Sequence, residues 1–192
     1  MRLVESTQGA ENQLKWELGW SVKCGEPPER WIPASVPGSV QLDWAKAEGW
    51  EPYWKGENVR QYEWMEDVWW TYRTVLPEGE YPQWIEFEGV DYAADVFLNG
   101  RQLIEFPGEK GVPLLKGLFS SKAVLVQTAG TLEVRMRPVP KSSPVRSNRQ
   151  ADQAFKPAVS YGWDFHPRLV PLGLWKPVRW VPFPVFNSPK LV

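Results

Sequence analysis

The sequence predicts an all-β fold, an antiparallel β-sandwich with one short helix, and three observations support this prediction. Nineteen prolines are scattered along the 192 residues, which leaves little room for long helices. Several short segments alternate apolar and polar residues, as half-buried strands do. Turn-forming residues separate these segments, so we expect about eight strands. They form a single domain whose core we place at residues 14–180.

The expected strands either show this alternation or are rich in aromatic and β-branched residues. They cover residues 14–20, 29–36, 68–76, 83–89, 95–98, 101–106, 123–127, 131–137 and 175–181. The clearest hairpin turn is Asn99-Gly100, because both residues accept the positive φ of a type I′ turn. Along 83–89, Ile85 and Phe87 share one face, and the glutamates share the other.

One helix is expected over residues 40–48, with Ser39 as its N-cap and Gly49 as its stop. Residues 50–67 are predicted to form a long loop that five aromatic side chains hold in place. The polar residues 138–148 are interpreted as a connection, and residues 181–192 as the start of a linker. Most of the thirteen tryptophans are expected in the core.

Composition excludes several classes of function. The net charge of −1 does not attract polyanions, so we expect neither nucleic acid nor membrane as a partner. The single cysteine, Cys24, permits no internal disulfide, and the single histidine, His166, excludes multi-histidine metal centres. No glycine-rich phosphate-binding motif occurs, so no cofactor is expected. The sequence also lacks an apolar N-terminal signal, which favours a cytoplasmic location.

No convincing catalytic centre is found either. Glycosidases commonly use two carboxylates that flank the bond they break. Glu86 and Glu88 lie on one face of a strand, about 7 Å apart at Cα, but a solvated strand face explains them without a function. Glu66 and Asp67 are interpreted in the same way. A serine hydrolase would have to use His166, and no G-x-S-x-G elbow accompanies it.

The most distinctive segment is residues 162–168, Gly-Trp-Asp-Phe-His-Pro-Arg. Its glycine and proline can shape a sharp loop. Asp164 lies between two aromatic residues, so its carboxylate can accept hydrogen bonds from two sugar hydroxyls while a ring faces the sugar. The structural alternative is an ion pair between Asp164 and Arg168, with Trp163 and Trp175 in the core. The residues alone leave both possibilities open.

Five segments follow one another in the order found in a known family. They are Val36-Pro-Gly-Ser-Val-Gln-Leu-Asp, Tyr53-Trp-Lys-Gly-Glu-Asn, Asp67-Val-Trp-Trp-Thr-Tyr-Arg, the hairpin 86–101 and Gly162-Trp-Asp-Phe-His-Pro-Arg with its continuation to Val178. Through them the chain resembles the N-terminal domain of family 2 glycoside hydrolases, and the β-mannosidase branch in particular. Phe165-His166 replaces the Trp-Gly that is usual in this branch, which bears on the width of the sugar subsite.

The resemblance implies a jelly-roll sandwich of the galactose-binding-domain-like type, followed by an immunoglobulin-like domain and a catalytic barrel in the same full-length chain. In the family the barrel of a retaining exo-glycosidase carries both catalytic glutamates, so this chain would carry no catalytic residue. A loop of the N-terminal domain reaches the sugar, here a β-mannoside. Asp164 inherits the contact with sugar hydroxyls, Trp163 lies beside it, and Asn58 is a further candidate.

Three alternatives stay open at this point. A free-standing carbohydrate-binding module would bind polysaccharide directly through tryptophan-lined loops. A purely structural domain would dock onto the barrel and contribute nothing to the sugar site. Within the family, the chain could also precede a β-galactosidase or β-glucuronidase type of barrel.

Overall fold

The computed structural model describes residues 14–103, 113–117, 121–152 and 154–182, and it has the predicted sandwich architecture. The larger sheet has the strand order β2-β1-β3-β9-β5-β6, with β7 also paired to β5, and the smaller sheet is β10-β4-β8. All pairings between these strands are antiparallel. The strands are β1 (Trp16–Ser21), β2 (Ile32–Ala34), β3 (Trp69–Leu76), β4 (Gln83–Phe87), β5 (Ala93–Leu98), β6 (Arg101–Leu103), β7 (Leu115–Lys116), β8 (Lys122–Val126), β9 (Gly130–Met136) and β10 (Val178–Pro182).

The core forms because alternate residues of neighbouring strands point to the same side. On β3, Trp70 and Tyr72 are fully buried, and their partners across the ladder are Met136 and Val134 of β9. Ile85 and Phe87 of β4 contribute to the same core cluster, so the predicted face of residues 83–89 is the buried one. Each fully buried side chain of this kind stabilises the fold by roughly 1.5–3 kcal/mol.

The predicted helix is α1 (Val40–Glu48), with the predicted ends. The Ser39 Oγ accepts a hydrogen bond from the Leu42 N–H at 3.4 Å, and Gly49 ends the helix with a φ of 67°. The hairpin turn is also confirmed, since Asn99 and Gly100 have φ values of 51° and 77°. Residues 104–106 of the predicted second hairpin strand lie outside the described residues.

Tryptophans connect α1 to the larger sheet. The Trp44 ring of α1 lies 5.4 Å from the Trp70 ring and 6.5 Å from the Trp20 ring, between centroids. Three tryptophans are buried in the core and four others pack against it: Trp16, Trp44 and Trp70, then Trp20, Trp50, Trp64 and Trp180. Trp54 and Trp163 are exposed instead.

The prediction that residues 50–67 form a loop was wrong over the second half of that range. Residues Asn58–Glu66 form the 3₁₀ helix η1, in which Tyr62 and Met65 are both buried. Residues three apart eclipse one another in a 3₁₀ helix, so this pair forms a single inward-facing stripe. Two further 3₁₀ helices, η2 (Asn148–Ala151) and η3 (Ala158–Tyr161), were not predicted. The predicted linker begins too early, because residues 181 and 182 still belong to β10, and its remaining residues 183–192 lie outside the described residues.

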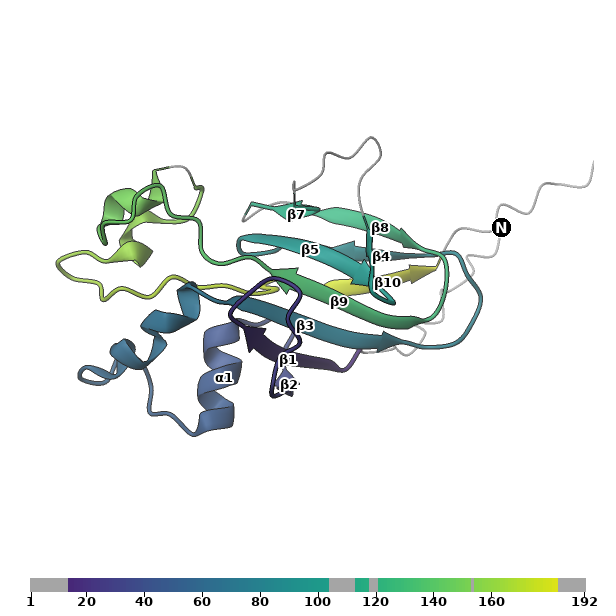
Figure 1. The fold of residues 1–192 in the computed structure, drawn as a ribbon, viewed down its shortest axis with the longest axis horizontal. Coiled ribbons are helices and arrows are strands. Elements are labelled where there is room, and N and C mark those ends of the chain that lie inside the picture. Colours follow the sequence, from purple (N-terminus) through teal and green to yellow (C-terminus); the bar gives the residue numbers. More distant parts are fainter. Residues whose placement is uncertain (1–13, 104–112, 118–120, 153, 183–192) are drawn as a thin grey trace, which may run out of the picture.

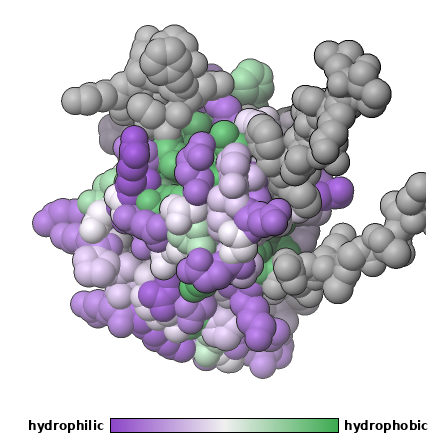
Figure 2. Space-filling model, turned by 90° about the vertical axis from the view of Figure 1, so that its right-hand side faces the viewer, coloured by the Kyte–Doolittle hydropathy of each residue, from purple (hydrophilic) through white to green (hydrophobic). Residues whose placement is uncertain are grey.

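The helices and the long connections gather at one end of the sandwich (Figure 1). There α1 and η1, drawn in blue, lie beneath the green and yellow segment that contains η2 and η3. Figure 2 views the opposite end, where hydrophilic residues cover much of the visible face. Within the described residues, no helix is long and apolar enough to cross a bilayer.

Candidate functional site

Asp164 lies at the tip of a two-residue turn. The Trp163 N–H donates to the His166 carbonyl at 2.9 Å, and the His166 N–H donates to the Trp163 carbonyl at 3.1 Å. Phe165 shares the tip and is 80% exposed, and Trp163 is 49% exposed. The Asp164 side chain is exposed too, and it has no hydrogen-bond or ion-pair partner among the described residues. Its carboxylate is therefore available to accept hydrogen bonds from a ligand.

The base of this turn is closed by the backbone and by Arg168. The Leu169 N–H donates to the Ser160 carbonyl at 3.0 Å, which pairs the two arms that lead into and out of the turn. The Arg168 Nη1 donates to the Tyr161 carbonyl at 2.9 Å, so the side chain of one arm also bonds to the backbone of the other. The Tyr161 hydroxyl donates to the Pro140 carbonyl at 2.8 Å. The tip of the turn is thus exposed, while hydrogen bonds fix the base of the turn.

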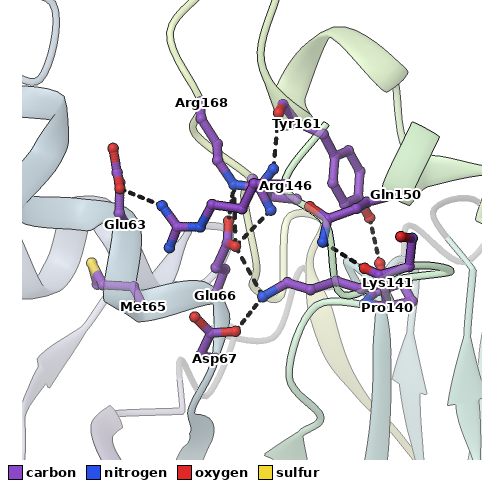
Figure 3. Close-up of polar contacts among 12 residues, drawn as sticks. Glu63, Met65, Glu66, Asp67, Pro140, Lys141, Arg146, Gln150, Tyr161 and Arg168 are labelled. Atoms are coloured by element: carbon purple, nitrogen blue, oxygen red, sulfur yellow. Dashed lines mark hydrogen bonds and ion pairs between the residues drawn. The ribbon is translucent and has the colours of Figure 1, made fainter. Parts of the chain in front are cut away.

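Arg168 pairs with Glu66 (Figure 3). Its Nε lies 3.2 and 3.0 Å from the two Glu66 carboxylate oxygens, and its Nη2 lies 2.6 Å from Oε1. The alternative of an Asp164–Arg168 ion pair is therefore wrong, and Trp163 is not in the core. The interpretation of Glu66 as a solvated side chain is also wrong, because its side chain is only 3% exposed.

Lys141 is a second cationic side chain that pairs with Glu66. The Lys141 Nζ lies 2.9 Å from the Glu66 Oε1 and also pairs with Asp67, which is exposed (Figure 3). Arg146 forms a separate pair with Glu63 on the same 3₁₀ helix, at 2.5 Å, and the hydrogen bond to Glu63 raises the pKa of Arg146. Burial, reinforced by the carboxylates Asp91 and Glu66, raises the pKa of the Tyr161 hydroxyl well above its usual range.

A second buried pair supports the arm that follows the turn. The Lys156 ammonium pairs with the Asp91 carboxylate and donates to the Pro171 carbonyl at 2.6 Å. Burial raises the pKa of Asp91 and lowers that of Lys156, while the attraction between the two groups opposes both shifts. Asp91 and Gly173 also exchange both backbone hydrogen bonds, at 2.8 and 2.7 Å. Gly173 has a φ of 155°, and a Cβ there would lie 2.6 Å from the Gly38 carbonyl oxygen, so the backbones can approach this closely only at a glycine.

Helix α1 is tied to the same arm through Gln41. Its Nε2 donates to the Val170 carbonyl at 2.9 Å, and its Oε1 accepts from the Leu172 N–H at 3.2 Å. The Val40 N–H donates to the Leu172 carbonyl at 2.9 Å. In the arm that follows the turn, Asp91 and Lys156 hold Pro171 and Gly173, and the start of α1 holds Val170 and Leu172. These contacts support the exposed turn rigidly.

A pocket of about 250 Å³ lies beside the turn. It is lined by Ser39, Gln41, Leu42, Tyr53, Ser160, His166, Leu169 and Pro171. The turn, the start of α1 and the loop before η1 therefore meet there, although they are far apart in sequence. The His166 Nδ1 is buried and has no partner within the described part of the chain.

A larger groove, of about 890 Å³, lies at the other end of the strands. It runs along the start of β1 and the end of β3, and Trp16, Thr74 and Val75 are among its lining residues. Turn residues and sequence-predicted site residues are absent from its lining. We therefore place the candidate site at the smaller pocket, next to the exposed carboxylate.

The third predicted site residue is separate from the turn. Asn58 is half-buried at the start of η1, and its Nδ2 donates to the Pro52 carbonyl at 3.2 Å. It does not line the pocket, whereas Tyr53 of the same loop does. The sequence placed Tyr53 only within a family segment, and none of its neighbours in the chain indicated that it would line the same pocket as His166.

Glu86 and Glu88, the two strand carboxylates considered as a catalytic pair, lie in surroundings that do not require a catalytic role. Glu86 is half-buried on β4, and the Glu88 Oε1 lies 2.5 Å from the Arg179 Nε. Residues 14–103, 113–117, 121–152 and 154–182 contain no cluster of three or more histidine, cysteine or acidic side chains that could hold a metal ion. What the site offers is therefore a hydrogen-bonding carboxylate, exposed aromatic rings and a small pocket, which suit binding.

Comparison with known proteins finds relatives among fungal enzymes. The chain is 27% identical over 191 residues to β-mannosidase B of Emericella nidulans, an alignment that covers 89% of this chain and 22% of that protein. It is 28% identical over 187 residues to β-mannosidase B of Aspergillus terreus, covering 87% and 22%. The chain thus spans about a fifth of the length of the curated relatives that it matches.

Solved structures give a consistent result. The β-D-mannosidase of Dictyoglomus thermophilum is similar with a TM-score of 0.68 and 26% identity, over 88% of this chain and 22% of that one. The profile of the family described as glycosyl hydrolase 2 galactose-binding domain-like matches residues 20–176, which include α1, η1 and the turn that carries Asp164. The chain therefore belongs to the glycosyl hydrolase 2 galactose-binding domain-like family, as the five ordered segments of its sequence predict.

Proposed function

We propose that this chain is the non-catalytic, sugar-binding domain of a retaining exo-β-glycosidase that acts on β-mannosides. In this proposal Asp164 accepts hydrogen bonds from hydroxyls of the sugar at the cleaved end, and Trp163 forms part of the wall. Asn58 is a further substrate contact. The catalytic glutamates belong to a barrel in the same full-length protein, and the protein acts in the cytoplasm.

The observation that carries the proposal is the exposed Asp164 carboxylate, which has no partner among the described residues and lies at the tip of a turn whose base is closed by hydrogen bonds. A mobile loop would lose backbone conformational freedom on binding, whereas the backbone of this turn is held by hydrogen bonds before the sugar binds. The neighbouring rings of Trp163 and Phe165 offer apolar faces that match the C–H face of a sugar. The names of the relatives supply the substrate class, and their length leaves room for a catalytic domain.

The central test is Asp164→Ala in the full-length enzyme, with an aryl β-mannoside as substrate. A hydrogen bond to a charged group is worth about 1.5–3 kcal/mol, so kcat/KM should fall by at least about tenfold. Asp152→Ala is the matched control, because Asp152 is also exposed and lies at the end of η2. Wild-type kinetics for Asp164→Ala would contradict a role for Asp164 in sugar binding.

The isolated chain distinguishes the proposal from a free-standing carbohydrate-binding module. Under the proposal half of the sugar site is missing, so the 192-residue chain should hydrolyse no aryl β-mannoside and should bind no manno-oligosaccharide in calorimetry. Saturable binding would favour the binding-module alternative instead. Measurable turnover by a pure preparation would contradict the non-catalytic assignment altogether.

A further inference from the structure

We propose that Glu66 is a positioning residue for the sugar site, acting through Arg168 to hold the turn that carries Asp164. This inference rests on the proposed function for its consequence in catalysis, but its structural part can be tested separately. Glu66 itself is buried, so it acts on the substrate only through other residues.

The backbone around Glu66 is held firmly against the larger sheet. Its backbone carbonyl accepts a hydrogen bond from the Val139 N–H at 2.9 Å, just beyond the end of β9. It is also the last residue of η1, three residues before β3 begins. Met65, its neighbour, is fully buried and accepts a hydrogen bond on its carbonyl from the Trp70 indole at 2.9 Å. The Glu66 carboxylate is therefore held relative to both β3 and β9.

Arg168 connects the Glu66 carboxylate to both arms of the turn. The Arg168 guanidinium is held by two of its nitrogens on Glu66, and the third donates to the Tyr161 carbonyl. Arg168 itself belongs to the arm that leaves the turn, and Tyr161 to the arm that enters it. A planar guanidinium with bidentate pairing has little rotational freedom, so Glu66 sets the position of both arms at once.

The neighbouring acidic residues cannot do the same. Glu63 pairs with Arg146, which is 53% exposed and belongs to the connection before η2. Asp67 is exposed and pairs only with Lys141 among the described residues. Of the three acids in this part of the chain, only Glu66 contacts the arginine that spans the base of the turn (Figure 3).

The test compares Glu66→Gln with Glu63→Gln in the ¹⁵N-labelled 192-residue chain. Both changes replace a carboxylate on η1 by an amide of the same size. Hydrogen exchange is measured at the Trp163 and His166 amides, which bond across the turn, and at the Tyr72 and Val134 amides in β3 and β9. In Glu66→Gln we expect exchange at the turn to accelerate at least about tenfold more than exchange in β3 and β9, whose amides report the loss of global stability. Glu63→Gln should leave all four amides as in the wild type.

Two outcomes would overturn the proposal. Turn amides that exchange at the wild-type rate in Glu66→Gln would show that the turn does not depend on Glu66. An equal acceleration in β3 and β9 would show a general loss of stability. Should Glu66→Gln fail to fold, Arg168→Lys serves in its place, because lysine keeps the charge but cannot bond to Glu66 and to Tyr161 in the same planar geometry. It should accelerate exchange at the turn more than exchange in β3 and β9.

Kinetics of the full-length enzyme then separate this inference from the proposed function. If Glu66 acts through Asp164, Glu66→Gln should lower kcat/KM in a wild-type background and have little further effect in an Asp164→Ala background. Additive effects would contradict the proposed connection. If Asp164→Ala has wild-type kinetics while Glu66→Gln still accelerates exchange at the turn, the proposed function is wrong. The inference that Glu66 holds the turn through Arg168 then still stands.

Discussion

Arg168 and Glu66 are 102 positions apart in the chain, yet three N–O distances of 2.6 to 3.2 Å join their side chains. Both side chains are almost completely removed from solvent, at 10% and 3% exposure. Such a pair contributes less to stability than its geometry suggests, because both charges lose their hydration on burial. Removing one member is costly, however, since the other is then left buried and charged.

Arg168→Ala should therefore lower the free energy of unfolding by about 3–5 kcal/mol. Urea denaturation followed by circular dichroism measures the change. Arg146→Ala is the matched control, because Arg146 also pairs with a glutamate of η1 but is half exposed. Exposed pairs contribute about 0–1 kcal/mol, so this variant should differ little from wild type. Equal losses of unfolding free energy in the two variants would mean that the buried pair is no more important for stability than the half-exposed one.

Lys156→Met should be at least as damaging, and its effect should depend on pH. Without the lysine, the buried Asp91 loses its cation, so its pKa rises further above the ordinary value of about 3.9. A carboxyl group whose pKa is raised by folding stabilises the folded state fully below its unfolded pKa and less as the pH rises through the folded pKa. The loss of stability relative to wild type should thus be larger at pH 7 than at pH 4.

Urea unfolding at the two pH values measures this difference, with Lys116→Met as the control. Lys116 is an exposed lysine of β7, so its replacement should have a small effect that is the same at both pH values. A loss for Lys156→Met that does not change with pH would mean that Asp91 is not the group left uncompensated.

Asp43→Asn should become more favourable relative to wild type as the pH rises. Asp43 is buried at the start of α1 and accepts a hydrogen bond from the Ser35 N–H at 2.9 Å, which an asparagine oxygen can also accept. Burial raises its pKa, so the wild type loses stability as the pH rises from the ordinary aspartate value through the raised one. The amide has no charge to desolvate and lacks this loss.

The measurement is the difference in unfolding free energy between Asp43→Asn and wild type at pH 3.5 and pH 7. The exposed Asp152 supplies the control as Asp152→Asn, for which we expect no such trend. A difference that moves in the opposite direction would indicate that the Ser35 hydrogen bond outweighs the cost of burial.

Gln41→Leu tests how firmly α1 holds the arm that follows the turn. The substitution removes the partners of the Val170 carbonyl and the Leu172 N–H, and a buried unsatisfied group costs about 1–3 kcal/mol. The melting temperature should fall by roughly 2–4 °C for each kcal/mol lost in a domain of this size. Gln61→Leu, on the exposed side of η1, should leave it almost unchanged. A wild-type melting temperature in Gln41→Leu would mean that water replaces both hydrogen bonds.

Much of the fold follows from local sequence patterns. The strands alternate with the period of two that a half-buried sheet requires, and Ser39, Gly49 and Asn99-Gly100 mark the ends of elements through their own backbone preferences. The 3₁₀ helix η1 was missed because its inward stripe consists of only Tyr62 and Met65, too few residues to show a period. The order of strands in the two sheets was not predicted either, since pairing depends on contacts between distant segments.

The sequence by itself determined that Asp164 lies in a sharp turn between aromatic residues, and its resemblance to a family placed that residue at the sugar. Only the tertiary structure decided that Arg168 pairs with Glu66, which leaves the Asp164 carboxylate unpaired among the described residues. Charge alone allows Arg168 to pair with either acid, and proximity in the chain favours Asp164. The folded chain places the Glu66 carboxylate against the base of the turn, where a buried guanidinium can satisfy it in a bidentate geometry.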